Sequence, residues 1–361
     1  MSRIPVTQAP SLLPVLYPAA SAPVGRGGNT YIYEAIHTAR GAAVSTSTQE
    51  VHLYEHFGVQ PVRTIKYHSD KVTQIRVREE SLMSSSRDGQ IAIWDLRQAS
   101  SAPSLVFKSD DAILSFDLSA DSSVLVGGTQ LNSDYAAKIQ FWDPRAAGGP
   151  VKVFEDSHSD DVTQIHCNPN APKQFLSGST DGLLCTFDLA QPDEDDALQF
   201  VANTGASVSQ CGYFGPDAQF VYVQSDMETL QLWTTEATQL ADFGDVRELG
   251  QGDVTIDYIV KCKYDPGSQR LYMIAGNNGG EVHLLHVGVE SMEYIQKLAL
   301  GNAGIVRGFD WDLSNGWAVA GCEGGKLAWW SKLEQMASSI VTPTSAGPRR
   351  PGPNSRRFTP Y

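Results

Sequence analysis

The chain has 361 residues, a formal net charge of −14 and five cysteines, none of them in a Cys-x-x-Cys pair. No run of 18 apolar residues is present, which excludes a membrane-spanning helix, and the odd number of isolated cysteines favours a reducing compartment, the cytoplasm or the nucleus. A chain this acidic is a poor match for nucleic acid, because phosphates are bound by clustered Lys and Arg.

Seven short apolar segments along the chain end in an aromatic or apolar residue. In chain order, these residues are Tyr54, Trp94, Trp142, Phe187, Trp233, Leu285 and Trp330, at intervals of 40, 48, 45, 46, 52 and 45 residues. A period in the forties with Trp-Asp endings is typical of four-stranded propeller blades. One blade cannot bury both faces of its sheet, so blades must stack around an axis. The repeats predict one all-β domain, a seven-bladed propeller over residues 11–331.

The two ends of the chain do not follow the repeat. Residues 1–10 are expected to be a disordered arm, residues 332–342 a short helix or coil, and residues 343–361 a disordered basic tail. The last blade then lacks an outer strand, which the N-terminus is expected to supply. Leu12–Tyr17 is the best candidate despite Pro14, because an outermost strand tolerates a residue without an N–H.

The second repeat is the most complete and resembles a WD repeat. It contains His68, then Ser84 and Ser86 on one face of a strand, then Asp88 before Trp94. In WD repeats such residues form a hydrogen-bonded set, because a buried imidazole and a buried indole N–H both need partners. The sequence does not distinguish which of the two serines belongs to the set.

The fourth repeat carries the same arrangement, with His158, Ser177, Ser179 and Asp181. Phe187 stands where the tryptophan is expected. We therefore expect the network of this blade to lack an indole donor.

Several segments outside the repeat signature resemble the family of WD repeat-containing protein 89, over roughly residues 40 to 331. The similarity is carried by residues 158–164, 168–170, 177–183, 193–198, 245–248, 257–258 and 304–311, and it is strongest from His158 to Asp188. The resemblance implies a seven-bladed propeller that interacts with other proteins, has no known enzymatic activity and has no firmly assigned partner.

Residues that could suggest catalysis or metal binding are better explained by the fold. The segment 321–326 superficially resembles a phosphate loop, but it lacks the full spacing and the Ser or Thr after Lys. His283 and His286 are three residues apart, which places them on opposite faces of a strand. We predict no catalytic, cofactor or metal site, and therefore a protein that is not an enzyme.

Charge is the strongest indication of a partner. Residues 1–30 and 343–361 together carry six arginines and no acidic residue, so the remaining body has a charge near −20 against −14 for the chain. Such a body favours basic protein segments through electrostatic steering. Two alternatives stay open: the acidity serves only solubility, or the chain's own Arg-rich tail occupies the acidic face.

Propellers usually bind peptides with the loops that lead into each blade and with the turns between inner strands. The candidate partner-binding residues in those loops are Asp70, Arg87, Asp160, Asp161 and, as an aromatic anchor, Tyr258. The third repeat has an enlarged turn, residues 129–137, which is a further candidate binding loop.

A second function class rests on two consecutive repeats that end in Trp-Asp-x-Arg. The arginines are Arg97 and Arg145, each two residues after the aspartate. The motif is similar to the box of substrate receptors for cullin-based ubiquitin ligases, in which the arginine meets the ligase adaptor. Arginine suits such an interface because its planar fork holds carboxylates or carbonyls. A ligase receptor is therefore the alternative to a plain scaffold.

Overall fold

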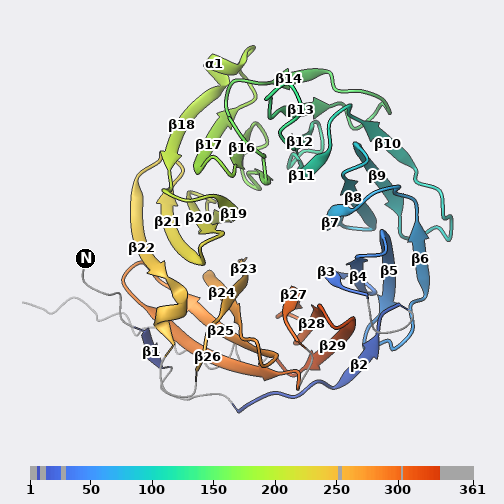
Figure 1. The fold of residues 1–361 in the computed structure, drawn as a ribbon, viewed down its shortest axis with the longest axis vertical. Helices are drawn as coiled ribbons and strands as arrows, with labels where there is room; N and C mark the ends of the chain where they lie inside the picture. Colours follow the sequence, from blue (N-terminus) through green and yellow to red (C-terminus); the bar gives the residue numbers. More distant parts are fainter. Residues whose placement is uncertain (1–5, 9–13, 26–29, 251–253, 302–303, 334–361) are drawn as a thin grey trace, which may run out of the picture.

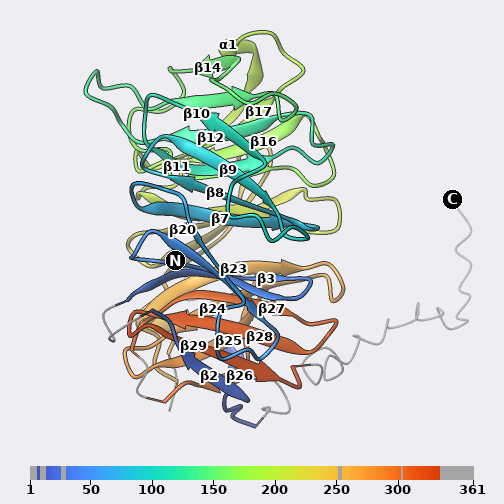
Figure 2. The same ribbon diagram turned by 90° about the vertical axis from the view of Figure 1, so that its right-hand side faces the viewer.

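The computed structural model describes residues 6–8, 14–25, 30–250, 254–301 and 304–333. Its strands form seven sheets that follow one another around a central axis (Figure 1). In the edge-on view the strands run across the disc from one face to the other (Figure 2). The seven-bladed all-β propeller predicted from the repeats is confirmed for this part of the chain.

The first four blades use consecutive strands, ordered from the axis outward. The first blade contains β3 (Ile32–Thr38), β4 (Gly41–Thr46), β5 (Glu50–Glu55) and β6 (Arg63–Lys66). The second contains β7 (Val72–Arg78), β8 (Ser81–Ser86), β9 (Gln90–Asp95) and β10 (Leu105–Lys108). The third contains β11 (Ile113–Leu118), β12 (Leu125–Thr129), β13 (Ile139–Trp142) and β14 (Lys152–Phe154). The fourth contains β15 (Gln164–Cys167), β16 (Gln174–Gly178), β17 (Leu183–Asp188) and β18 (Leu198–Asn203).

The remaining blades include the N-terminal strands β1 (Val6–Gln8) and β2 (Ala20–Pro23). The fifth contains β19 (Val208–Phe214), β20 (Phe220–Ser225), β21 (Thr229–Thr234) and β22 (Gln239–Asp245). The sixth contains β23 (Tyr258–Asp265), β24 (Arg270–Gly276), β25 (Glu281–Val287), β26 (Met292–Ala299) and β1. The seventh contains β27 (Val306–Asp312), β28 (Trp317–Cys322), β29 (Lys326–Ser331) and β2. The helices α1 (Glu194–Ala197) and η1 (Val246–Leu249) lie between strands, and no described helix is long and apolar enough to cross a membrane.

A bulge in the innermost strands decides which side chains face the channel. In β7 the pairing register shifts between Val72 and Gln74, so that Val72 and Ile75, three residues apart, are both buried. Gln74 and Arg76 then line the central channel. The inner strands of the first, third, fifth, sixth and seventh blades shift at the corresponding position.

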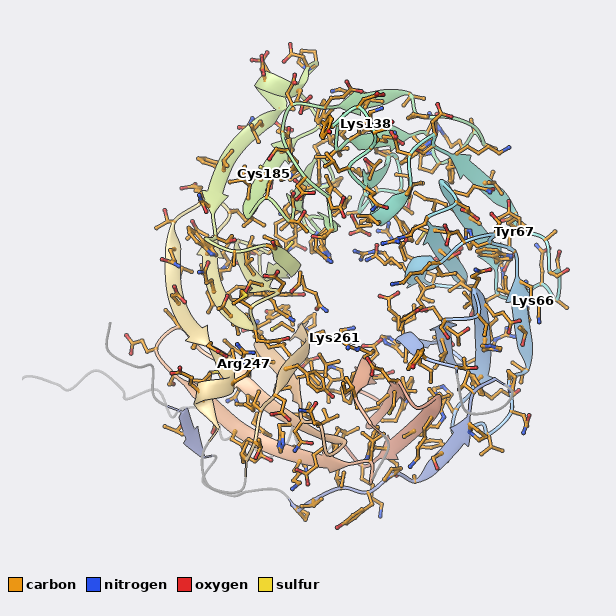
Figure 3. The ribbon with its side chains drawn as sticks, viewed as in Figure 1. Lys66, Tyr67, Lys138, Cys185, Arg247 and Lys261 are labelled. Carbon is orange, nitrogen blue, oxygen red and sulfur yellow. The ribbon has the colours of Figure 1, made fainter. Side chains whose placement is uncertain are left out.

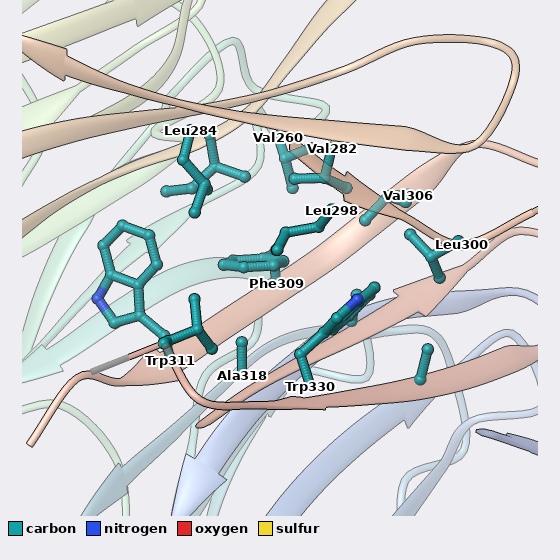
Figure 4. Packing of buried hydrophobic residues seen from close by; sticks show 14 of the residues in the cluster. Val260, Val282, Leu284, Leu298, Leu300, Val306, Phe309, Trp311, Ala318 and Trp330 are labelled. Atoms are coloured by element: carbon teal, nitrogen blue, oxygen red, sulfur yellow. The ribbon is translucent and has the colours of Figure 1, made fainter. Parts of the chain in front are cut away.

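The hydrophobic core is divided into seven clusters, one between each pair of neighbouring blades. The residue that ends each repeat packs into the cluster between its own blade and the preceding one: Tyr54, Trp94, Trp142, Phe187, Trp233, Leu285 and Trp330. Figure 4 shows the cluster between the sixth and seventh blades, where Trp330 lies near Phe309. The repeat signature therefore marks the contacts that hold one blade against the next.

The N-terminal segment closes the ring, but not with the residues that the sequence suggested. The outer strand of the seventh blade is β2, which pairs antiparallel with β29. Of the predicted strand Leu12–Tyr17, residues 12 and 13 lie outside the described residues, and Leu16 makes a single parallel bridge to Leu298 of the sixth blade. The prediction relied on the apolar residues of 12–17, whereas an outer strand is held by backbone hydrogen bonds to its neighbour, and β2 makes these bonds.

Part of the predicted disordered arm is also a strand. Residues 6–8 form β1, which pairs in parallel with β26 at the outer edge of the sixth blade. Residues 1–5 and 9–10, and nearly all of the predicted C-terminal helix and the whole basic tail, residues 334–361, lie outside the described residues.

Candidate functional site

Two faces of the ring can be distinguished by their loops. The upper face carries the loops that lead from each outer strand to the next inner strand, and the turns between the second and third strands of each blade. The lower face carries the other connections.

In the second blade, a His–Ser–Asp set ties an upper-face loop to the inner strands. The Nδ1 atom of His68 lies 3.0 Å from a carboxylate oxygen of Asp88, and its Nε2 lies 2.7 Å from the Ser84 Oγ. Asp88 also accepts the N–H of Ser69 at 2.9 Å. Because a carboxylate only accepts, Nδ1 carries a proton and donates it to Asp88.

The fourth blade repeats this geometry. The Nδ1 atom of His158 lies 3.0 Å from Asp181, and its Nε2 lies 2.6 Å from the Ser177 Oγ. The structure thus separates the serines that the sequence left equivalent. Ser84 and Ser177 contact the imidazole, whereas Ser86 and Ser179 donate to the carbonyls of Asp70 and Asp160.

The tryptophan does not belong to the hydrogen-bonded set. The indole N–H of Trp94 points to the carbonyl of Ser101 at 3.4 Å, and its ring meets His68 edge-on with centroids 6.3 Å apart. Trp142 likewise donates to a carbonyl, that of Lys108. Phe187 lacks an indole donor, as the sequence indicated, but this removes no hydrogen bond from the His–Ser–Asp set, and the Phe187 ring stacks on Phe175.

Of the predicted partner-binding residues, three are accessible and two are used within the fold. Asp70 and Arg87 are exposed and Asp160 is half-buried on the upper face. Asp161 accepts the N–H of Leu131 at 2.7 Å. The Tyr258 hydroxyl accepts the N–H of residue 306 at 2.8 Å, while its ring packs into the core between the sixth and seventh blades. Neither Asp161 nor Tyr258 is a free contact.

Three accessible carboxylates on the upper face of the third and fourth blades were not predicted from the sequence. Asp110, Asp134 and Asp156 are exposed, and among the described residues none forms an ion pair or a side-chain hydrogen bond. Tyr135, at the tip of the enlarged turn, is 86% exposed and has a φ of 61°. The length of this turn was the only feature of the sequence that pointed to this region, and it gave no indication of the neighbouring loops that carry Asp110 and Asp156.

Three loops of this surface are fixed to one another. Asn132 donates to Asp111 at 3.1 Å, and the ammonium of Lys138 lies 3.1 Å from Asp111 and 3.7 Å from Glu155. With the bond from Leu131 to Asp161, these contacts hold the segments 109–112, 130–138 and 155–161 together. We call the exposed residues Asp110, Asp134, Tyr135 and Asp156 the acidic surface.

The two Trp-Asp-x-Arg boxes lie on the lower face of adjacent blades. The guanidinium of Arg97 binds both carboxylate oxygens of Asp95 at 2.8 and 2.9 Å, and Arg145 binds Asp143 in the same way. The arginine side chains are 68% and 85% exposed. Hydrogen bonds from the Arg145 side chain and N–H lower the pKa of Asp143 to about 2.

The central channel, about 1340 Å³ in volume, is lined by the seven inner strands. A side chain of each inner strand bonds to the backbone of the next, all the way around. The pairs are Glu34 to Ile75 N, 2.6 Å; Gln74 to Phe116 N, 2.8 Å; Asp117 to Cys167 N, 2.9 Å; Gln164 to Ser209 O, 2.8 Å; Gln210 to Val260 O, 3.0 Å; Lys263 to Trp311 O, 3.0 Å; and Asp310 to His37 N, 2.9 Å. We call this set the latch ring.

Metal-type clusters and disulfides are not found in the part of the chain that the structure describes. No group of three His, Cys, Asp or Glu residues there is placed to hold a metal ion, and all five cysteines are buried and free. His283 is fully buried with Nδ1 3.1 Å from the Tyr294 hydroxyl, whereas His286 is a quarter exposed near Glu293. The segment 321–326 forms the turn between β28 and β29, and Lys326 donates to the carbonyl of Leu300.

We predict that Asp88→Ala destabilises the folded protein by about 1 to 3 kcal/mol. The change leaves the His68 Nδ1–H and the Ser69 N–H without an acceptor. Urea denaturation followed by tryptophan fluorescence measures the effect. Asp110→Ala is the matched control, because the Asp110 carboxylate has no bond to lose, and an unchanged midpoint for Asp88→Ala contradicts the assignment.

The His–Ser–Asp set also makes stability depend on acid. Burial opposes ionisation of Asp88, but the hydrogen bonds from His68 and Ser69 outweigh it and hold the pKa of Asp88 below its usual value. The pKa of Asp181 is lowered in the same way by His158. A lowered carboxyl pKa stabilises the fold above the unfolded-state pKa, near 3.8 to 3.9, and this contribution is lost as the pH falls through the folded-state pKa.

Comparison with known proteins agrees with the geometry. The WD domain, G-beta repeat family matches residues 59–95, which span β6 to β9. The chain is 32% identical over 295 residues to WD repeat-containing protein GTS1 of Arabidopsis thaliana, covering 78% of this chain and 72% of the relative. It is 25% identical over 341 residues to WD repeat-containing protein 89 homolog of Dictyostelium discoideum, covering 92% of each. The chain belongs to the WD repeat family of propeller proteins that includes these two relatives.

Proposed function

We propose that this protein is a non-enzymatic scaffold of the cytoplasm or nucleus, whose acidic surface binds a basic segment of a partner protein. WD repeat propellers generally mediate protein–protein interactions. The observation that carries the proposal is the set of exposed carboxylates, Asp110, Asp134 and Asp156, that have no cation partner among the described residues.

The contrast between the two kinds of carboxylate on the ring supports this reading. The carboxylates of Glu34, Asp117 and Asp310 in the channel are bonded within the fold, so their charge has a structural use. The three carboxylates of the acidic surface stabilise nothing that the structure describes. Free charge of one sign on a fixed surface steers a partner of opposite charge and selects against like-charged ones.

Tyr135 adds a second element of recognition beside the carboxylates. An aromatic side chain that is 86% exposed is unusual in a folded domain, and tyrosine is enriched among the residues that dominate binding energy. It can also place its ring against an arginine or lysine of the partner. A segment rich in Lys and Arg therefore matches both parts of the surface.

We predict that Asp110→Lys, Asp134→Lys and Asp156→Lys combined weaken binding of a fluorescent ten-residue Lys/Arg peptide by at least tenfold. The change replaces three attractive charges by three repulsive ones. Fluorescence anisotropy in about 0.1 M salt, where the screening length is about 10 Å, measures the affinity.

The matched control reverses three exposed acids of the lower face, Asp217, Glu236 and Glu290. Each reversal changes the charge by two, so both triple variants have a formal charge of −8 where the native chain has −14. Equal weakening in both variants would mean that only net charge matters, and the acidic surface would then have no special role.

The ligase receptor remains the second candidate, favoured by one observation. Arg97 and Arg145 lie in corresponding turns of adjacent blades on the same face, and both are exposed. An interface on this face would leave the acidic surface free for a substrate. The bidentate bonds to Asp95 and Asp143 already give each arginine a partner, so an adaptor would have to engage the remaining guanidinium edge.

We predict for this candidate that Arg97→Ala with Arg145→Ala abolishes co-purification of a cullin adaptor while the thermal melting point stays unchanged. Immunoblotting of the eluate from tagged full-length protein is the readout. Arg247→Ala is the control, because Arg247 binds Asp245 with the same bidentate geometry at the end of the outer strand β22. An adaptor that is absent from the wild-type eluate, or retained by the double variant, removes the ligase reading.

A further inference from the structure

The channel wall carries charged side chains, and most of them are bonded. Glu34, Asp117 and Asp310 each accept a backbone N–H in the latch ring. Asp310 is also paired with Lys263. These contacts explain why buried charges are tolerated along the wall, because each has a hydrogen-bonded partner.

Lys261 is a partly buried charged residue of the wall that lacks such a partner. It lies on β23, lines the cavity and is only partly accessible; Figure 3 labels it at the edge of the open centre. Within the described ranges its ammonium has no hydrogen bond and no ion pair. Burial lowers the pKa of Lys261, and the charges of Asp310 and Glu34 oppose this at a distance. Asp310 is bonded to His37 and Lys263, and one oxygen of Glu34 to the N–H of Ile75. A half-buried ammonium without a hydrogen-bonded partner is unfavourable.

Arg76 supplies a second, fixed positive charge to the same wall. Its Nε donates to the carbonyl of Phe116 at 2.7 Å and its Nη2 to that of Ile165 at 3.0 Å, so the guanidinium spans the inner strands of three blades. Its Nη2 also lies 3.3 Å from Nδ1 of His166, which must accept, so this imidazole is neutral.

Two titratable groups near Lys261 have shifted pKa values. Burial, and then the charges of Arg76 and Lys261, hold the pKa of His166 well below its ordinary value. Burial also raises the pKa of Glu34 to about 6, so its carboxylate loses charge only as the pH falls toward 6. Arg76 is paired with Asp117 at 3.5 Å and Lys263 with Asp310, whereas the partly buried ammonium of Lys261 has no bonded partner among the described residues.

We propose that the central channel binds an oxyanion, a phosphate or carboxylate group, whose oxygens accept from the ammonium of Lys261 in the field of Arg76. The ligand enters a cavity that is wide enough for a small molecule or an extended peptide side chain. This site is separate from the acidic surface, and it selects the opposite charge.

Isothermal titration calorimetry of the full-length chain with sodium pyrophosphate and, separately, with a pentaglutamate peptide tests the proposal. Lys261→Met removes the ammonium and keeps the length of the side chain, so binding of the accepted probe is expected to weaken at least tenfold. Because Lys261 makes no bond within the fold, the variant is expected to melt no lower than the native protein. Lys173→Met, at an exposed lysine of the turn before β16, is the matched control with unchanged affinity.

The two probes distinguish the source of the anion. Lys261-dependent binding of pyrophosphate supports a free small molecule, and Lys261-dependent binding of pentaglutamate supports an acidic segment of a partner. Failure of both probes to bind, or equal affinity in the native protein and Lys261→Met, overturns the proposal.

Discussion

The ring depends on hydrogen bonds to the backbone groups at the free edge of each of its seven innermost strands. An innermost strand pairs with its neighbour on one side only, and its other edge faces the channel. The latch ring uses that edge: one side chain per strand reaches across to a backbone N–H or carbonyl of the next blade. Four of these side chains, Glu34, Asp117, Lys263 and Asp310, are charged, and hydrogen bonds to charged groups contribute about 1.5 to 3 kcal/mol each. All seven bonds link one blade to the next around the axis.

This constraint determines which charges are available for recognition. Glu34, Asp117 and Asp310 are bonded in the latch ring, whereas the wall cation Lys261 has no bonded partner among the described residues. Asp110, Asp134 and Asp156 of the upper face take no part in closure, and their carboxylates have no bonded partner among the described residues. The same chain can therefore present negative charge on a face and positive charge within its channel.

The fold was predictable because its most regular contacts are local in the sequence. Each repeat-ending residue, such as Trp94 or Trp330, follows its turn at a constant distance and packs between two blades. The closing strand was not predictable in this way. Apolar content favoured Leu12–Tyr17, whereas closure is set by backbone bonds such as Ala19 N–H to the carbonyl of Trp329.

The candidate site was predictable only in part, for the same reason. The His68 and His158 sets lie within single repeats, and their residue types were readable, although the role of the indole was not. Asp161 and Tyr258 are engaged by residues 30 and 48 positions away, which no local pattern reveals. The bulge that turns Arg76 into the channel breaks the simple alternation that a strand suggests.

The central claim is that partners are recognised through the free carboxylates of the upper face. A zero-length carbodiimide cross-linker joins carboxylates to amines that touch them, so mass spectrometry of complexes purified from cells reads the interface directly. The account predicts cross-links from Asp110, Asp134 or Asp156 to lysines of the partner. Cross-links confined to acids of the lower face, such as Asp217 and Glu236, would contradict it.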